Sequence, residues 1–158
     1  MRISQLQVNL LRLLLQDASL SLEVLAEKLG KSRQSIGREI KELEEAGIIQ
    51  RKTIVVDAQK VGLTMTSFVL VSLKSHGDGL LDLFEEYVRD HLPNVIESAH
   101  ISGSWDLLLK VVVRDSSHFA EVHRNLTNMP NVARTRGHHV IGAPRQYPLP
   151  LEIDKPIA

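Results

Sequence analysis

Apolar residues recur every three or four positions in three successive segments of the first fifty residues. These positions are Ile3, Leu6, Leu10 and Leu13, then Leu22, Leu25, Ala26 and Leu29, and finally Ile36, Ile40 and Leu43. Such spacing places apolar side chains on one face of an amphipathic helix. The sequence therefore predicts three helices in this part of the chain.

Residues with strong capping preferences mark the ends of the second and third predicted helices. Ser21 and Ser32 precede the two apolar stripes, where a serine hydroxyl can accept a backbone N–H of the first helical turn. Gly30 stands where a left-handed residue ends a helix, and Gly47 closes the third helix in the same way. A helix, a short turn containing glycine and a second helix are typical of a helix-turn-helix.

The segment after Gly47 changes character. Residues 48–56 are rich in β-branched side chains, which predicts a short strand or wing, and residues 57–62 are predicted to form a linker. Residues 1–60 are thus expected to form a winged helix-turn-helix domain with its linker.

The second half of the chain repeats one pattern. A strand over 68–73, a helix with Leu80, Phe84, Tyr87 and Val88 facing inward, and a strand over 95–101 are predicted. A strand over 107–113, a helix marked by Phe119, Val122, Leu126 and Met129, and a strand over 132–141 follow. A Pro-Asn-Val corner opens the last strand of each copy, at Pro93 and Pro130. Two copies of strand-helix-strand predict a ferredoxin-like βαββαβ domain over 61–142 in an α+β protein.

The predicted sheet has a face that its own helices cannot cover. Two helices cover one face of a four-stranded sheet, yet the strands over 67–73 and 107–113 carry apolar residues on both faces. This pattern predicts that two copies of the chain associate through their sheets as a homodimer.

Charge changes the picture locally. The net charge is +0, with 10 Lys or Arg against 8 Asp or Glu in residues 1–60. Residues 28–41, however, contain one acidic residue, Glu39, among five basic ones: Lys28, Lys31, Arg33, Arg38 and Lys41. The third predicted helix is therefore expected to carry a basic patch.

The apolar stripe of this helix determines which side chains face outward. If Ile36 and Ile40 face the core, Arg33, Gln34, Arg38 and Lys41 project away from it. Arginine pairs with guanine and glutamine with adenine in the major groove, whereas Arg51 and Lys52 in the wing would contact phosphates. The predicted DNA-binding residues are Lys31, Ser32, Arg33, Gln34, Ser35, Arg38, Lys41, Arg51 and Lys52. The alternative is a solvated basic face on a structural helix.

The loop at 102–106 combines Gly103, Trp105 and Asp106, and Trp105 is the only tryptophan. Two interpretations remain open: a tight hairpin whose tryptophan fills a gap, or a loop that binds an amino-acid-sized ligand. The histidines do not predict a metal site, because His138 and His139 alternate on a strand and His118 and His123 are five apart. No metal and no cofactor are therefore expected.

Other features limit the class of protein. The absence of cysteine excludes disulfides and thiol catalysis. No apolar run reaches the roughly 18 residues of a membrane span, so a cytoplasmic protein without membrane association is expected. Four of the six prolines, at 144, 148, 150 and 156, predict an extended tail over 143–158.

From about Ile3 to Ile141 the chain resembles the Lrp/AsnC (leucine-responsive regulator) family. The resemblance rests on Ser32 with Ile36, Ile40, Leu43-Glu44 and Gly47-Ile48-Ile49, on Ser102-Gly103, Asp106 and the strand 107–111, and on Pro130-Asn131-Val132 with Thr135-Arg136. It implies a winged helix-turn-helix, a ferredoxin-like sensor domain, dimers that often build octamers, and amino-acid effectors bound between dimers near the 102–106 loop.

The resemblance also defines candidate effector residues and departures from the family pattern. The candidates are Gly103, Ser104, Trp105, Asp106, Thr135, Arg136 and Gly137. Ser4 and Gln7 stand where the family usually has aspartates, and Glu39 where it usually has an arginine. Ser104 and Trp105 replace an aspartate and a tyrosine or phenylalanine, and Gly137 replaces a threonine or serine.

Together these observations predict a regulator that binds double-stranded DNA sequence-specifically and responds to a small molecule, an amino acid or related metabolite. One alternative is a sirohaem-decarboxylase-like enzyme of the same architecture, but residues 138–143 are a poor substitute for that enzyme's Arg-Phe-Gly-Ala-like segment, so no enzyme is expected. The others are a DNA-binding regulator without effector, an adaptor that has lost DNA binding, and an RNA-binding sheet. The last needs displayed aromatic residues, and the central strands offer Phe68 alone.

Overall fold

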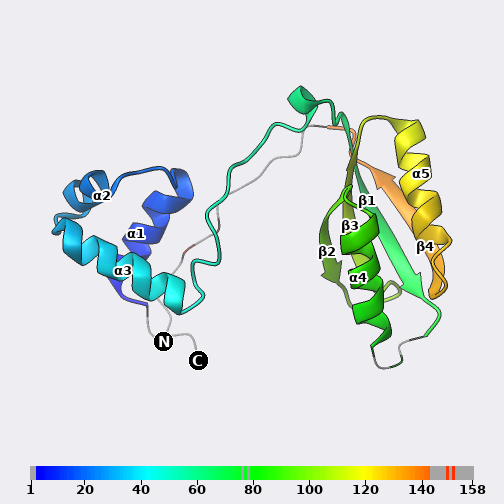
Figure 1. The fold of residues 1–158 in the computed structure, drawn as a ribbon, viewed down its shortest axis with the longest axis horizontal. Helices are drawn as coiled ribbons and strands as arrows, with labels where there is room; N and C mark the ends of the chain where they lie inside the picture. The colour runs from blue at the N-terminus through cyan, green and yellow to red at the C-terminus, as the bar shows by residue number, and fades with distance from the viewer. Residues whose placement is uncertain (1–2, 76, 78, 143–148, 150, 152–158) are drawn as a thin grey trace. The chain divides into compact units, whose positions relative to one another are not determined.

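The computed structural model describes residues 3–75, 77, 79–142, 149 and 151. The chain divides into two compact units, one of residues 1–55 with 145–158 and one of residues 56–144 (Figure 1). The tail expected over 143–158 lies outside the described residues, apart from Leu149 and Leu151.

The first unit contains α1 (Gln5–Gln16), α2 (Leu22–Leu29) and α3 (Arg33–Glu45). Gly30 ends α2 in the left-handed conformation, with φ of 62°, which glycine adopts readily. The Lys31 N–H donates to the Ala26 carbonyl at 3.0 Å. The Ser32 hydroxyl then accepts the Ser35 N–H at 3.1 Å and begins α3. Three residues therefore connect the two helices, as the helix-turn-helix prediction requires.

The core of this unit joins all three helices. Leu10, Leu25, Ile36 and Leu43 are fully buried, and Leu151 from the far end of the chain packs against the same cluster. The Arg12 guanidinium on α1 donates to the Leu151 carbonyl at 2.9 Å. A residue of the C-terminal segment is thus part of the first unit.

The start of α1 explains two departures from the family pattern. Ser4 and Gln7 form a reciprocal capping box. The Ser4 hydroxyl accepts the Gln7 N–H at 3.2 Å. In return, the Gln7 side chain accepts the Ser4 N–H at 2.9 Å. Gln7 is buried, and its hydrogen bonds with Ser4 stabilise the first turn of α1.

The strand expected within 48–56 does not form. These residues are irregular and extended, and Ile54 and Val55 are 82% and 81% exposed. A strand requires a hydrogen-bonded neighbour, and the described part of this unit offers none. The β-branched composition was therefore insufficient by itself to specify a strand.

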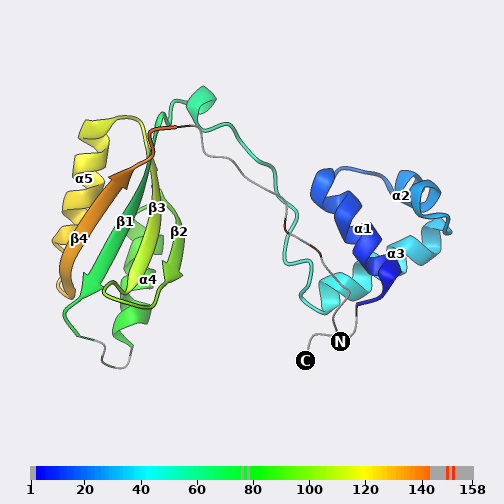
Figure 2. The same ribbon diagram turned by 180° about the vertical axis from the view of Figure 1, so that it is seen from behind.

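The second unit begins with a 3₁₀ turn (Gln59–Val61) and continues as β1 (Met65–Leu73), α4 (Leu80–His91), β2 (Val95–His100), β3 (Leu107–Val113), α5 (Ser116–Thr127) and β4 (Val132–His139). The four strands lie in the order β2-β3-β1-β4 with antiparallel neighbours. Figures 1 and 2 show both helices on one face of this sheet. The predicted ferredoxin-like domain is confirmed.

The helix-covered face holds the core of the second unit. Val69, Val71, Leu109 and Leu126 are fully buried there, together with Phe84. The inward position expected for Tyr87 was wrong. Tyr87 is 38% exposed, and its ring stacks on that of His91, one turn further along α4, with 4.5 Å between the ring centroids.

The opposite face of the sheet, which we term the open face, carries the alternate residues of each strand. Phe68, Leu70 and Leu108 lie on it, and Leu70 is directly opposite Leu108 in the β1–β3 register. Phe68 is exposed and the two leucines are half-buried. Glu97 on β2 pairs with Lys110 on β3 at 3.8 Å on the same face.

Candidate nucleic-acid interface and effector loop

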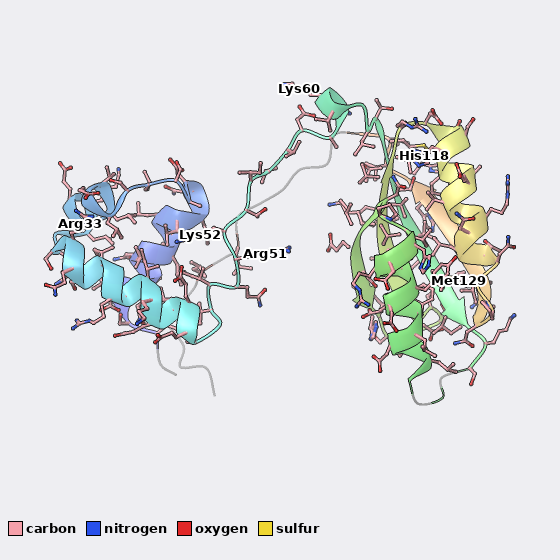
Figure 3. The ribbon with its side chains drawn as sticks, viewed as in Figure 1. Arg33, Arg51, Lys52, Lys60, His118 and Met129 are labelled. Carbon is pink, nitrogen blue, oxygen red and sulfur yellow. The ribbon has the colours of Figure 1, made fainter. Side chains whose placement is uncertain are left out.

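The outward face of α3 carries the polar residues that the sequence predicts for it. Ile36, Ile40 and Leu43 are buried, and Arg33, Gln34, Arg38 and Lys41 are exposed. Figure 3 shows Arg33 at the start of this helix. Ser32 and Ser35 are used for the helix cap, and Lys31 is exposed in the turn. A buried stripe on one side and a polar row on the other give α3 a free surface beside its N-terminus.

Carboxylates accompany the basic side chains of this surface. Arg33 pairs with Glu23 at 2.8 Å, Arg38 with Glu42 at 3.8 Å, and Lys41 with Glu45 at 3.5 Å. All three carboxylates lie outside residues 28–41, so the basic patch expected from that window is balanced locally by its neighbours.

Glu23 belongs to the first turn of α2. Its pKa is lowered, chiefly because its own backbone N–H donates to the carboxylate, and further by the Ser21 hydroxyl and the positive charge of Arg33. Glu23 is therefore anionic at neutral pH.

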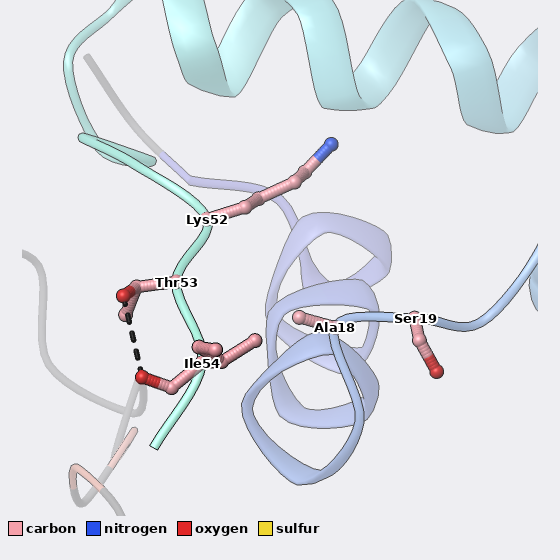
Figure 4. Close-up of a pocket in the computed structure, with 5 residues that line it drawn as sticks. All are labelled: Ala18, Ser19, Lys52, Thr53 and Ile54. Atoms are coloured by element: carbon pink, nitrogen blue, oxygen red, sulfur yellow. Dashed lines mark hydrogen bonds between the residues drawn. The ribbon is translucent and has the colours of Figure 1, made fainter. Parts of the chain in front are cut away.

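Lys52 lies near the other end of α3, where its ammonium pairs with Glu44 at 3.3 Å. In Figure 4, Lys52 extends toward the helix from a pocket that it lines with Ala18, Ser19, Thr53 and Ile54. Because a helix rises about 1.5 Å per residue, the predicted contacts at Arg33 and Lys52 are spread along most of α3. Arg51 is exposed beside them.

The loop between β2 and β3 contains a contact that sequence reasoning missed. The Arg134 guanidinium lies over the Trp105 ring at 4.4 Å from its centroid, and it donates to the Ser104 carbonyl at 2.9 Å. Gly103 has φ of 120°, a backbone conformation that glycine accommodates readily. Arg134 therefore belongs with the candidate effector-binding residues. In the sequence, only its position next to the predicted residue Thr135 indicated such a role.

Asp106 anchors the same loop to the end of β1. Its carboxylate accepts the Leu73 N–H at 2.7 Å, and its backbone N–H donates to the Val71 carbonyl at 2.9 Å. This carboxylate thus has a structural role whatever else it contacts.

The predicted effector residues on β4 face two directions. Thr135 faces α5, where its hydroxyl lies 2.9 Å from His123 Nε2. Gly137 also faces α5, because a Cβ placed there would lie 3.0 Å from Phe119 Cζ. Since side chains alternate along a strand, Arg134 and Arg136 face away from α5. Within this unit, Thr135 and Gly137 are on the opposite side of β4 from the arginine that contacts Trp105.

Neither a candidate metal site nor a helix that could span a membrane is found in the described part of the chain. The described residues contain no group of three or more His, Cys, Asp or Glu side chains placed to hold a metal ion. Within the same residues, none of the helices combines the length and the hydropathy that a membrane span requires.

Two family models and several curated relatives match the chain. Residues 66–150 match the Lrp/AsnC ligand binding domain, and residues 3–50 match a winged helix-turn-helix DNA-binding domain. The glutamate uptake regulatory protein of Zymomonas mobilis is 32% identical over 80% of this chain and 77% of its own length. The DNA-binding transcriptional activator DecR of Escherichia coli is 33% identical over 76% of this chain and 78% of its own length. These relatives are a regulatory protein and a transcriptional activator.

Solved structures of two bacterial transcriptional regulators are similar to nearly the whole chain. An AsnC family transcriptional regulator from Agrobacterium tumefaciens superimposes with a TM-score of 0.85 and 30% identity, covering 96% of this chain and 97% of that one. A transcriptional regulator from Neisseria meningitidis in complex with L-Met gives a TM-score of 0.85 and 25% identity, covering 94% of this chain and 96% of that one. With its helix-turn-helix, its ferredoxin-like domain and these matches to both, the chain belongs to the Lrp/AsnC family of DNA-binding transcription regulators.

Proposed function

We propose that α3 is the recognition helix of this regulator and that Arg33, Gln34 and Arg38 contact base edges in the major groove. The observation that carries this proposal is the exposed polar row opposite buried Ile36 and Ile40, directly after a three-residue turn. Residues near the start of a recognition helix are those that reach the bases. Lys31, Ser32, Ser35, Lys41, Arg51 and Lys52 would contact the phosphate backbone.

The open face supports a homodimer. Phe68, Leu70 and Leu108 form an apolar strip on a sheet face without helices, and such strips mark association surfaces. The exposed β-branched side chains of residues 54–56 also offer apolar surface for a second copy to cover. Family resemblance adds an octamer as the larger assembly.

The proposed effector is an amino acid or a related metabolite bound at the 102–106 loop. The L-Met complex of the Neisseria meningitidis regulator supports this ligand class. Arg134 and Arg136 point to the side of β4 where the loop lies, and arginine is suited to bind a ligand carboxylate. Gly103, Ser104, Trp105 and Asp106 would line the site. Thr135 and Gly137 would act through their contacts with α5 or a neighbouring dimer.

The recognition proposal is tested with operator DNA selected from genomic fragments by the full-length protein. We expect Arg38→Ala to weaken operator binding by about 1 to 3 kcal/mol, the value of a good base contact, and to leave random DNA nearly unaffected. Lys52→Ala should weaken both. Folded variants that bind operator like the wild type would remove α3 from the recognition role.

The effector proposal is tested through Trp105, whose emission reports on the loop without a label. Amino acids are titrated singly into the full-length protein, and Trp105 emission and sedimentation are followed. A ligand shared between dimers changes assembly only through a different affinity for the assembled state. Millimolar concentrations detect binding free energies of about −4 kcal/mol or stronger. If no amino acid alters either signal at millimolar concentration, the loop is structural.

A further inference from the structure

The ion pairs on the candidate recognition surface differ in kind. Arg38–Glu42 and Lys41–Glu45 are pairs within α3, with the basic residue preceding the acid, which is the less favourable order in a helix. The Arg33–Glu23 pair connects two helices and is the shortest of the three, at 2.8 Å. The position of Arg33 therefore depends on a residue outside the recognition helix.

Glu23 lies in the first turn of α2, where the start of the helix and the Arg33 guanidinium both favour its negative charge. Its pKa is lowered, chiefly by its own backbone N–H and then by the Ser21 hydroxyl. The Arg33 side chain is 68% exposed, however, and exposed ion pairs are weak. The pair can hold Arg33 in the free protein and still exchange for a better partner.

We propose that Glu23 determines DNA specificity by withholding Arg33 from the phosphates of random DNA. This inference rests on the proposed role of α3 in binding DNA. On random DNA, moving Arg33 from Glu23 to a phosphate would only exchange one anionic partner for another. Arg33 therefore remains with Glu23 and releases no counterion from the duplex. At the operator, a guanine edge in register with the recognition helix offers the guanidinium two hydrogen bonds in a fixed geometry. Specificity is a difference between two affinities, and Glu23 lowers the weaker one.

The test uses full-length protein and a short random-sequence duplex, with binding followed by fluorescence anisotropy. Because each additional phosphate contact steepens the dependence of log K on log salt by about 0.9, Glu23→Gln should steepen it by that amount between about 50 and 200 mM salt. Affinity at the lower salt should rise several-fold, and the ratio of operator to random affinity should fall. Circular dichroism melting curves establish that each variant is folded.

Glu27→Gln is the matched control. The substitution removes the same charge from another exposed glutamate of α2, and Glu27 forms no ion pair within the described residues. A Glu23→Gln variant that behaves like Glu27→Gln, or that binds random DNA more weakly than wild type, overturns the proposal.

A double variant separates withholding from simple repulsion. Glu23→Gln should have no effect in a chain that already carries Arg33→Gln. If the gain in affinity persists without Arg33, Glu23 acts by repelling phosphates and the proposal is wrong. If Arg33→Gln and Arg38→Ala leave both operator and random binding unchanged, the proposed role of α3 itself fails. If they weaken binding while Glu23→Gln strengthens nothing, this inference alone fails.

Discussion

At the scale of single residues, Asp106 shows how a candidate ligand-binding group can be needed for the fold. Its carboxylate accepts the Leu73 N–H at 2.7 Å. Asp106→Ala leaves that donor without its partner, so we expect the free energy of unfolding to fall by about 1 to 3 kcal/mol. Urea denaturation measures this change. Ser104→Ala is the control in the same loop, and equal stability of the two variants would contradict the prediction.

Arg134 and Trp105 form the second testable pair at this scale. The guanidinium lies 4.4 Å from the ring centroid. Such a contact predicts a cation–π interaction of about 0.5 to 1 kcal/mol. Replacing Arg134 with alanine should shift the emission of Trp105 in the absence of any ligand, because the ring loses its charged neighbour. The same replacement at Arg136 is the comparison, and indistinguishable spectra for the two variants would argue against the contact.

The sequence predicted local residue roles well and distant ones poorly. Gly30 and Ser32 were recognisable as caps because capping depends on residues within one turn. The contact of Arg134 with the loop joins positions 30 residues apart, and Glu23 reaches Arg33 across a turn between helices. Neither arrangement is encoded in a short window of sequence, so both had to be found in the structure.

At the scale of elements, hydrophobic spacing identified the five α-helices of the described residues, and apolar runs and Pro-Asn-Val corners identified the strands of the sheet; the 3₁₀ turn at Gln59–Val61 was not predicted. The stripes of α3 and β1 were predictable because one face of each is buried against neighbours in the same unit. The segment 48–56 has equally strong β-branched composition but no neighbour to pair with in the described unit. Composition thus predicts a strand only where a partner strand is available.

The contact between α1 and the C-terminal segment gives a prediction at the same scale. Leu151 is half-buried against the helix-turn-helix core. Leu151→Ala should lower the free energy of unfolding of this unit by about 1 kcal/mol, a part of the value for a fully buried leucine. Helical circular dichroism in urea measures the loss.

Leu149→Ala is the matched control for this variant, because Leu149 is 66% exposed two residues earlier. Equal midpoints for the two variants would mean that Leu151 contributes nothing to the first unit.

At the scale of the whole molecule, the open face predicts the state of association. A charge placed in the strip of Phe68, Leu70 and Leu108 would be desolvated in a sheet-to-sheet dimer. Leu70→Glu should therefore shift the full-length protein toward monomer in sedimentation velocity.

Leu83→Glu provides the comparison for Leu70→Glu, since Leu83 is 61% exposed on α4, away from the open face. Wild-type sedimentation of Leu70→Glu, or equal dissociation of both variants, would exclude the open face as the interface.

Overall charge illustrates the limit of composition at this scale. A net charge of +0 gave little reason to expect a nucleic-acid partner, and a basic window in residues 28–41 suggested one. The structure adds acids from outside the window to Arg33, Arg38 and Lys41. The surface proposed to contact DNA is therefore one of paired charges, which neither the net charge of the chain nor the charge count of residues 28–41 describes.

The packing of Phe119 over Gly137 has an evolutionary consequence. With 3.0 Å between a Cβ at 137 and Phe119 Cζ, a side chain at 137 would require the ring to shift by a few tenths of an ångström. Substitutions at the two positions should consequently be correlated in the family. Homologues with threonine or serine at the position of Gly137 should carry a smaller residue at that of Phe119, and the acquisition of a large ring should follow, rather than precede, the loss of the side chain from the strand.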